Sequence, residues 1–124
     1  MKREVCFLIT RTGALVYADF SDNATALPDS RLRWQMIWKL RDQLDEIAHS
    51  HPLGGLFFSA EDLSTMQAVD SALGRTLAYA VVTPQGIIAR RGERVFTPHL
   101  EPWWTGLMRS ASGMSIRYID NKGA

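Results

Sequence analysis

The sequence predicts an α/β fold in which a mixed, largely antiparallel sheet is flanked by helices. Three observations favour it. Several short apolar segments lie between turn residues, as strands do. Two longer segments carry apolar residues at helical spacing. These segments do not alternate strictly, which argues against an all-parallel sheet. A chain of 124 residues with 46% hydrophobic residues is expected to form a single domain over residues 1–124.

The first two elements are predicted to form a hairpin. Residues 5–9 are apolar and include cysteine and phenylalanine, which predicts a buried strand. Residues 11–13 form a turn-like Arg-Thr-Gly, and residues 14–20 predict the second strand. The polar residues 21–29, with Asn and Pro, predict a loop.

A first helix is predicted to follow, with Asp29 or Ser30 as its N-cap. Its apolar face would consist of Leu32, Met36, Ile37, Leu40 and Leu44. Residues 46–48 then predict a brief strand that leads into His49.

A second helix is predicted after a loop at residues 52–58 that contains two glycines. Ser59 opens this helix and Gly74 ends it, because glycine readily takes the left-handed conformation at a helix C-terminus. Its apolar face would consist of Leu63, Met66, Val69 and Leu73.

The last third of the chain predicts three more strands and no further helix. The strands cover residues 76–83, 87–90 and 94–97, with turns at 84–86 and 91–92. A tail with Pro98, Pro102, Trp103 and Trp104 precedes a polar end. The tryptophan pair either caps the core or forms an exposed contact patch.

Composition narrows the function classes. A net charge of +1 argues against a dedicated nucleic-acid binder or membrane-surface binder. The single cysteine, Cys6, cannot form an internal disulfide, which favours a reducing compartment and predicts a cytoplasmic protein. No apolar run reaches the length of about 18 residues that a membrane span needs, and the apolar segment behind the basic start is too short and too polar for a secretory signal.

The chemistry is concentrated in His49-Ser50-His51-Pro52, followed six residues later by Ser59-Ala60-Glu61-Asp62. In extended backbone, residues i and i+2 project to the same side, so the two histidines can face one metal ion. Pro52 favours that extended conformation at His51. Two imidazoles and the Asp62 carboxylate make a three-ligand zinc set that leaves a fourth position open for water, as catalytic zinc sites do.

Simpler interpretations stand beside this one. Ser59 and Asp62 have the spacing of a helix capping box, a role that is compatible with metal binding. The histidine pair could be solvent-exposed or hydrogen-bonded. Glu61 lies about 100° around the helix from Asp62 and is left outside the ligand set. His99, far along the chain, is interpreted as a structural or surface residue.

The same residues resemble the JAMM signature of the JAB/MPN metalloproteases: two histidines and a proline, a six- or seven-residue gap, then Ser-x-x-Asp. That family also has a glutamate on an early strand, and Glu4 stands in its place here. The resemblance covers residues 4–96 and implies a cytidine-deaminase-like, MPN-type fold. It implies Zn²⁺ bound by His49, His51 and Asp62, with Glu4 as general base and Ser59 helping to hold the oxyanion. Phe7 and Arg11 replace two glycines of the family.

The expected function is therefore a zinc-dependent peptidase or isopeptidase. The resemblance is to small standalone prokaryotic JAB proteins, which implies peptides or the C-termini of ubiquitin-like and sulfur-carrier proteins as substrates, or a phage-tail-associated peptidase. A non-catalytic MPN-like interaction module is the alternative, and Phe7 and Arg11 favour it. A zinc hydrolase that acts on a non-peptide amide is a third possibility.

Overall fold

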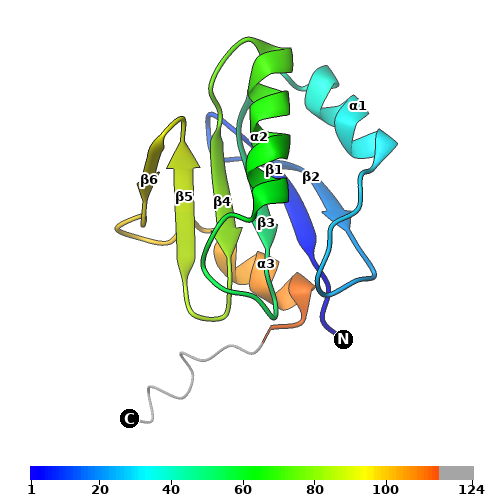
Figure 1. Cartoon of the computed structure of the whole chain (residues 1–124), viewed down its shortest axis with the longest axis vertical. Coiled ribbons are helices and arrows are strands. Elements are labelled where there is room, and N and C mark those ends of the chain that lie inside the picture. The colour runs from blue at the N-terminus through cyan, green and yellow to red at the C-terminus, as the bar shows by residue number, and fades with distance from the viewer. Residues whose placement is uncertain (115–124) are drawn as a thin grey trace.

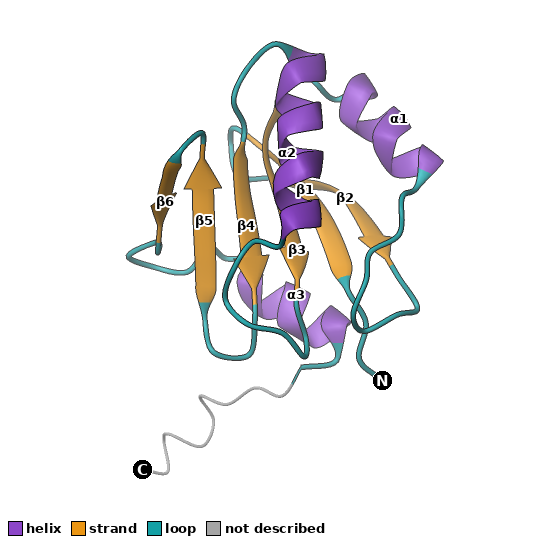
Figure 2. Ribbon diagram, viewed as in Figure 1, coloured by secondary structure: helices purple, strands orange, loops and turns teal. Residues whose placement is uncertain are grey.

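The computed structural model describes residues 1–114 as a six-stranded sheet with helices on both faces (Figures 1 and 2). The strand order across the sheet is β2-β1-β3-β4-β5-β6. Along the chain the elements are β1 (Val5–Thr10), β2 (Leu15–Phe20), α1 (Arg31–Lys39), β3 (Leu44–Ser50), α2 (Ala60–Leu73), β4 (Ala78–Val82), β5 (Ile87–Arg91), β6 (Arg94–Phe96) and α3 (Thr105–Ser112).

The sheet is mixed and mostly antiparallel, as predicted. Among the strands of residues 1–114, only β3 and β4 run parallel, and every other neighbouring pair is antiparallel. A parallel pair needs a crossover connection, and α2 supplies it between these two strands. The α/β class is therefore confirmed, and the central strand β3 lies between an antiparallel neighbour and a parallel one.

Helices cover the two faces differently. The helices α1 and α2 pack on one face, while α3 packs on the other (Figure 1). Because side chains alternate along a strand, neighbouring residues such as Phe7 and Leu8 enter different cores. Phe7 joins Trp104 and Met108 under α3, and Leu8 joins the core under α1 and α2. Within residues 1–114, no helix combines the length and apolar character needed to cross a bilayer.

Most predicted element boundaries are close to those in the structure. The β1–β2 hairpin turns at Gly13, whose φ of 85° is left-handed. Ser30, one of the two predicted caps, begins α1 by accepting a hydrogen bond from the Arg33 backbone N–H. Ser59 and Gly74 cap the two ends of α2, and Gly74 has a φ of 70°. The last three strands differ from the predicted ranges by one or two residues at their ends.

The predicted first helix is too long. It ends at Lys39, and Leu44 is instead the fully buried first residue of β3. The Leu44 N–H still bonds the Leu40 carbonyl, so the helical spacing of apolar residues continues for one turn after the helix has ended. Leu32, assigned to the apolar face, is 55% exposed. The strand that delivers the histidines is consequently longer than predicted and firmly anchored in the sheet.

The third helix, α3, was not predicted. Serine, glycine and threonine are frequent in Thr105–Ser112, which weakens the helical signal. The helix forms because Trp104 and Met108 bury their side chains against the sheet. The two tryptophans lie in different environments. Trp104 is buried in the core with 1% exposure, while Trp103 is 64% exposed and donates its indole N–H to the Gly13 carbonyl. Residues 115–124 of the predicted polar end lie outside the described residues.

Candidate metal centre

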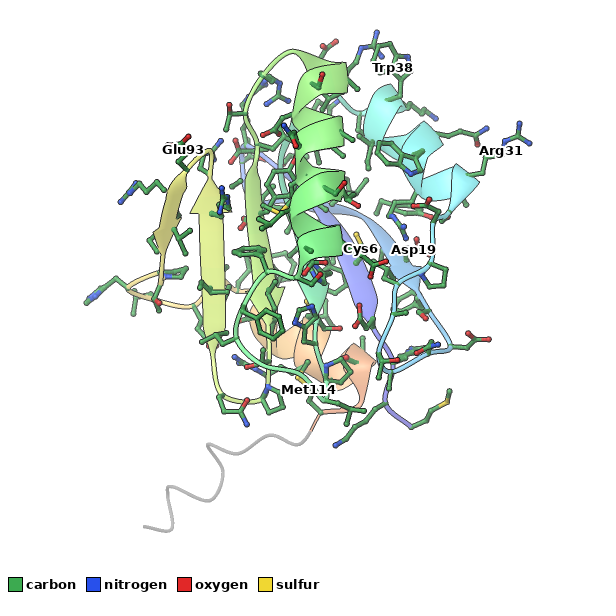
Figure 3. All side chains as sticks on the ribbon, viewed as in Figure 1. Cys6, Asp19, Arg31, Trp38, Glu93 and Met114 are labelled. Atoms are coloured by element: carbon green, nitrogen blue, oxygen red, sulfur yellow. The ribbon has the colours of Figure 1, made fainter. Side chains whose placement is uncertain are left out.

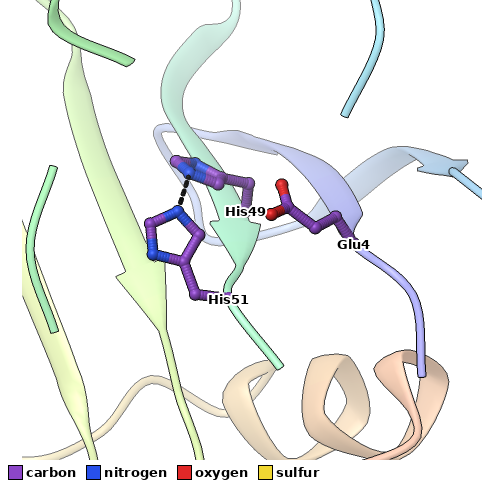
Figure 4. Close-up of side chains that lie close together, drawn as sticks. All are labelled: Glu4, His49 and His51. Atoms are coloured by element: carbon purple, nitrogen blue, oxygen red, sulfur yellow. Dashed lines mark hydrogen bonds between the residues drawn. The ribbon is translucent and has the colours of Figure 1, made fainter. Parts of the chain in front are cut away.

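Strand pairing brings Glu4 to the histidines. In the antiparallel pair β1–β3, Cys6 lies opposite His49, so the same register continued by two positions sets Glu4 opposite His51. The His51 N–H donates to the Val82 carbonyl and continues the extended backbone beyond the end of β3. Side-chain alternation therefore turns these side chains to one face (Figure 4). Ligand atoms of Glu4, His49 and His51 all lie within 4.8 Å of one another.

Asp62 reaches the same place from the first turn of α2. Its Oδ1 lies 3.2 Å from His49 Nε2, and its Oδ2 lies 3.5 Å from His51 Nε2. Asp62 Oδ2 also accepts the Ser59 backbone N–H at 2.8 Å, and Ser59 Oγ accepts the Asp62 backbone N–H at 3.0 Å. The capping box is thus present, and it aims the carboxylate at the histidines.

Hydrogen bonding fixes which nitrogen of His51 faces the cluster. Its Nδ1 lies 3.2 Å from the Gly55 carbonyl oxygen. A carbonyl only accepts, so Nδ1 carries the proton, and Nε2 of the neutral ring presents a lone pair. That lone pair faces His49 Nε2 at 3.0 Å. Either a proton on His49 Nε2 or a metal ion between the rings can accept this lone pair. A hydrogen bond from the other ring nitrogen to a backbone carbonyl is usual for metal-binding histidines.

The geometry fits a tetrahedral metal ion. The two Nε2 atoms lie 3.0 Å apart, and each is near a different Asp62 oxygen, His49 at 3.2 Å from Oδ1 and His51 at 3.5 Å from Oδ2. Zinc ligands at ~2.0–2.1 Å in tetrahedral geometry are about 3.3 Å apart. Nitrogen and carboxylate donors are also zinc's usual ligands. The three predicted ligands therefore suit Zn²⁺, with Glu4 beside them.

Burial and contacts move the pKa values of the two carboxylates in opposite directions. Burial raises the pKa of Glu4, and this effect outweighs the opposing influence of the nearby histidines. Burial also raises the pKa of Asp62, but its close contacts with the His49 and His51 rings and the hydrogen bond from the Ser59 backbone outweigh it and leave that pKa well below its usual range. Asp62 thus stays ionised, whereas Glu4 takes up a proton more readily.

A cleft of about 700 Å³ includes these residues in its lining. It extends between α1 and α2, under the loop at residues 24–29. Cys6 and Asp19 lie on the part of the sheet between the two helices in Figure 3, and Cys6 lines the cleft. Ser59 and Glu61 line it as well. His99 is exposed and outside this lining, in agreement with its interpretation as a structural or surface residue.

The serine between the two histidines was not singled out from the sequence. Ser50 points to the opposite face of the sheet, where its fully buried Oγ accepts the Val5 N–H at 2.9 Å. It also shares a 2.8 Å hydrogen bond with Ser112 of α3. These bonds link the histidine strand to the segment that carries Glu4. The sequence did contain a clue to this role, because Ser50 is a polar residue in a buried strand and lies between two site residues.

A scan against protein-family models matches no family, and a search of curated proteins finds no match to this chain. The roles assigned to these residues therefore rest on the motif and on the geometry.

Proposed function

We propose that this protein is a zinc-dependent hydrolase of amide bonds, a peptidase or isopeptidase with an MPN-type fold. One observation carries the proposal: two imidazole Nε2 atoms and one ionised carboxylate converge within 3.5 Å, with a second carboxylate, Glu4, alongside. The first three groups form a ligand set that leaves a coordination position open, and the fourth has the raised pKa that suits a general base.

The residues divide the reaction among them. His49, His51 and Asp62 would hold the metal ion, which when bound lowers the pKa of a coordinated water and polarises the substrate carbonyl. Glu4 accepts a proton from the attacking water and passes it to the amide nitrogen as the C–N bond breaks, so that the products are a carboxylic acid and an amine. The Ser59 hydroxyl donates to the carbonyl oxygen as negative charge develops there.

The proposed substrates follow from the resemblance to JAMM proteases. They are peptides or the C-terminal tails of ubiquitin-like or sulfur-carrier proteins, and a phage-tail-associated peptidase belongs to the same proposal. The cleft supports a substrate larger than a single amide, because about 700 Å³ lies within the usual range of ligand sites.

Phe7 and Arg11, the two replacements of family glycines that favoured an interaction module, lie away from the proposed metal ligands. Phe7 points under α3 and packs edge-to-face on Trp104 at 6.3 Å between ring centroids. Arg11 is exposed in the hairpin turn and donates to the Asp42 carbonyl. Neither replacement alters the surroundings of His49, His51 or Asp62, which supports the enzyme over the module.

The test combines metal content with one substitution. Protein purified without chelator should hold about one zinc per chain. The Glu4→Gln variant should retain that zinc and lose about 10²–10⁴-fold in hydrolysis of a panel of peptide and ubiquitin-like C-terminal amides. Glu93→Gln, at the exposed β5–β6 turn, is the matched control and should keep full activity. Absence of zinc binding would refute the ligand set, and bound zinc without any turnover in the parent would favour the interaction module.

A further inference from the structure

Beyond the metal centre, the cleft continues as an apolar limb. It runs between α1 and α2 over the side of the sheet that carries the histidines. The apolar side chains of this limb are Trp34, Ile37, Ile47, Met66, Val69 and Tyr79. Ile37, Met66, Val69 and Tyr79 are buried members of the core under these helices, and Trp34 and Ile47 are partly buried and pack against them, so the limb borders the core.

The loop between His51 and α2 extends this apolar character to the mouth of the cleft. Leu53 and Phe57 line the cleft and are 59% and 54% exposed, so two large apolar side chains meet solvent at its edge. The Phe57 ring lies 5.8 Å from the His51 ring. An exposed apolar rim that touches a reactive group is typical of a ligand-binding site.

The charges around the cleft oppose an acidic ligand. Arg33 lines the cleft, but its Nη1 is paired with Asp19 at 2.6 Å and its Nη2 donates to the Pro28 carbonyl at 2.9 Å. Its charge is therefore already compensated. The exposed lining residues Asp29 and Glu61 carry negative charge at the cleft, and in the metal-free protein Asp62 adds to it. A carboxylate in the metal-free cleft would be repelled by these groups.

We propose that the limb is a specificity site that binds a bulky apolar side chain of the substrate close to the amide to be cleaved. This inference rests on the proposed function for the claim that the bound group belongs to a substrate. Glycine at that position would leave the limb filled with water, whereas an aromatic or large aliphatic side chain would exclude water from apolar walls. A large apolar group filling such a pocket is expected to gain tenfold or more over its absence.

Binding of uncleaved peptides tests the limb separately from catalysis. The probes are three capped pentapeptides with four glycines around a central phenylalanine, glycine or aspartate. Their affinities are measured by NMR titration, with the protein held in chelator and again with zinc added. We expect the phenylalanine peptide to bind at least tenfold more tightly than the glycine peptide in both conditions, and at least tenfold more tightly than the aspartate peptide in chelator.

Substitutions on α2 locate the binding. Thr65 is exposed and lines the cleft, while Gln67 is exposed on the same helix outside the lining. Thr65→Trp should fill the limb and remove the preference for phenylalanine, and Gln67→Trp should leave it intact. Ala26→Trp, on the loop across the cleft, provides a second obstruction if the first variant is unstable.

Equal affinities for the three peptides, or a preference that survives both obstructing variants, would overturn the proposal. The two proposals fail in distinguishable ways. A protein that binds no zinc and cleaves nothing, yet prefers the phenylalanine peptide in chelator, refutes the hydrolase and keeps the apolar limb. A protein that binds zinc and cleaves amides but shows no preference for the phenylalanine peptide refutes the apolar limb and keeps the hydrolase.

Discussion

The two faces of the sheet are built from alternate residues of the same strands, but they differ in how they are closed. On one face α3 lies against the sheet, and Trp104 and Met108 are fully buried. On the other face α1 and α2 leave a cleft between them, and ionisable groups line it. The first face resembles an ordinary domain core, and the second holds every residue assigned to the proposed chemistry.

Three consecutive residues show this contrast most directly. His49 and His51 point to the open face, and Ser50 between them points to the closed face. Residues of the closed face therefore fix the backbone from which the reactive side chains project. Rigid support of this kind is what a site needs to hold its ligands in place. The following predictions ask whether the two faces can be perturbed separately.

The largest effect is expected on the closed face. Trp104→Ala removes the largest fully buried side chain, and it should lower the free energy of unfolding by about 3–5 kcal/mol. Chemical denaturation measures the loss. The zinc affinity of the remaining folded protein should stay within about threefold of the parent, because Trp104 lies across the sheet from the ligands.

Trp103→Ala is the matched control. Its side chain is mostly exposed, so it should cost much less stability than Trp104→Ala. A strong loss of zinc affinity in folded Trp104→Ala would show that the two faces are coupled more tightly than their separate cores indicate.

On the open face, Asp62→Asn should weaken zinc binding by about 100-fold or more, because a charged ligand becomes a neutral one. Asparagine keeps the size of the side chain and part of its capping ability, so the metal-free protein should stay folded. Competition with a chromophoric chelator measures the affinity.

Ser59→Ala separates the cap from the ligand. It removes the hydroxyl that accepts the Asp62 N–H and leaves the carboxylate in place. It should cost about 0.5–2 kcal/mol of stability while zinc affinity changes far less than in Asp62→Asn. Equal zinc affinity in Asp62→Asn and the parent would mean that Asp62 serves only as a cap.

The sequence predicted the open face better than the closed one, for physical reasons. The residues His49, His51, Ser59 and Asp62 lie within fourteen positions, so local spacing and a capping box were enough to group them. The proximity of Glu4 depends on strand pairing over more than forty residues, and only the resemblance indicated it. The helix α3 forms through tertiary burial of Trp104 and Met108, which local propensity does not encode. The cleft likewise depends on the separation of two helices.

A comparable loss of stability is expected at the hydroxyl pair that joins β3 to α3 on the closed face. Ser50→Ala leaves the buried Val5 N–H and the Ser112 hydroxyl each without a partner that they have in the parent. It should lower the free energy of unfolding by about 1–3 kcal/mol. Thermal or chemical denaturation measures it.

A double-mutant cycle with Ser112→Ala identifies the shared bond. The double variant should lose clearly less than the sum of the two single variants, because both remove the same contact. Strictly additive losses would show that the two hydroxyls act independently and that α3 does not support the histidine strand through them.

The smallest effect concerns a carboxyl on the closed face. Alternation along β3 places Glu46 on the same face as Ala48 and Ser50. Burial raises the pKa of Glu46 to about 7, the neighbouring Asp45 adds to this, and Arg91 opposes it. The folded protein therefore holds a proton on Glu46 at pH values where the unfolded chain has lost it, and stability falls as pH rises from about 4.5 to 7.

Glu46→Gln, which cannot ionise, should gain about 1 kcal/mol of stability relative to the parent between pH 5 and pH 8, a value reduced by the partial exposure of the carboxyl. Urea denaturation of both proteins in chelator, so that metal binding adds no pH dependence of its own, measures the difference at each pH. A difference that stays constant across this range would show that Glu46 is already solvated as an ion, and that the closed face tolerates a charge at its edge as readily as the open one does.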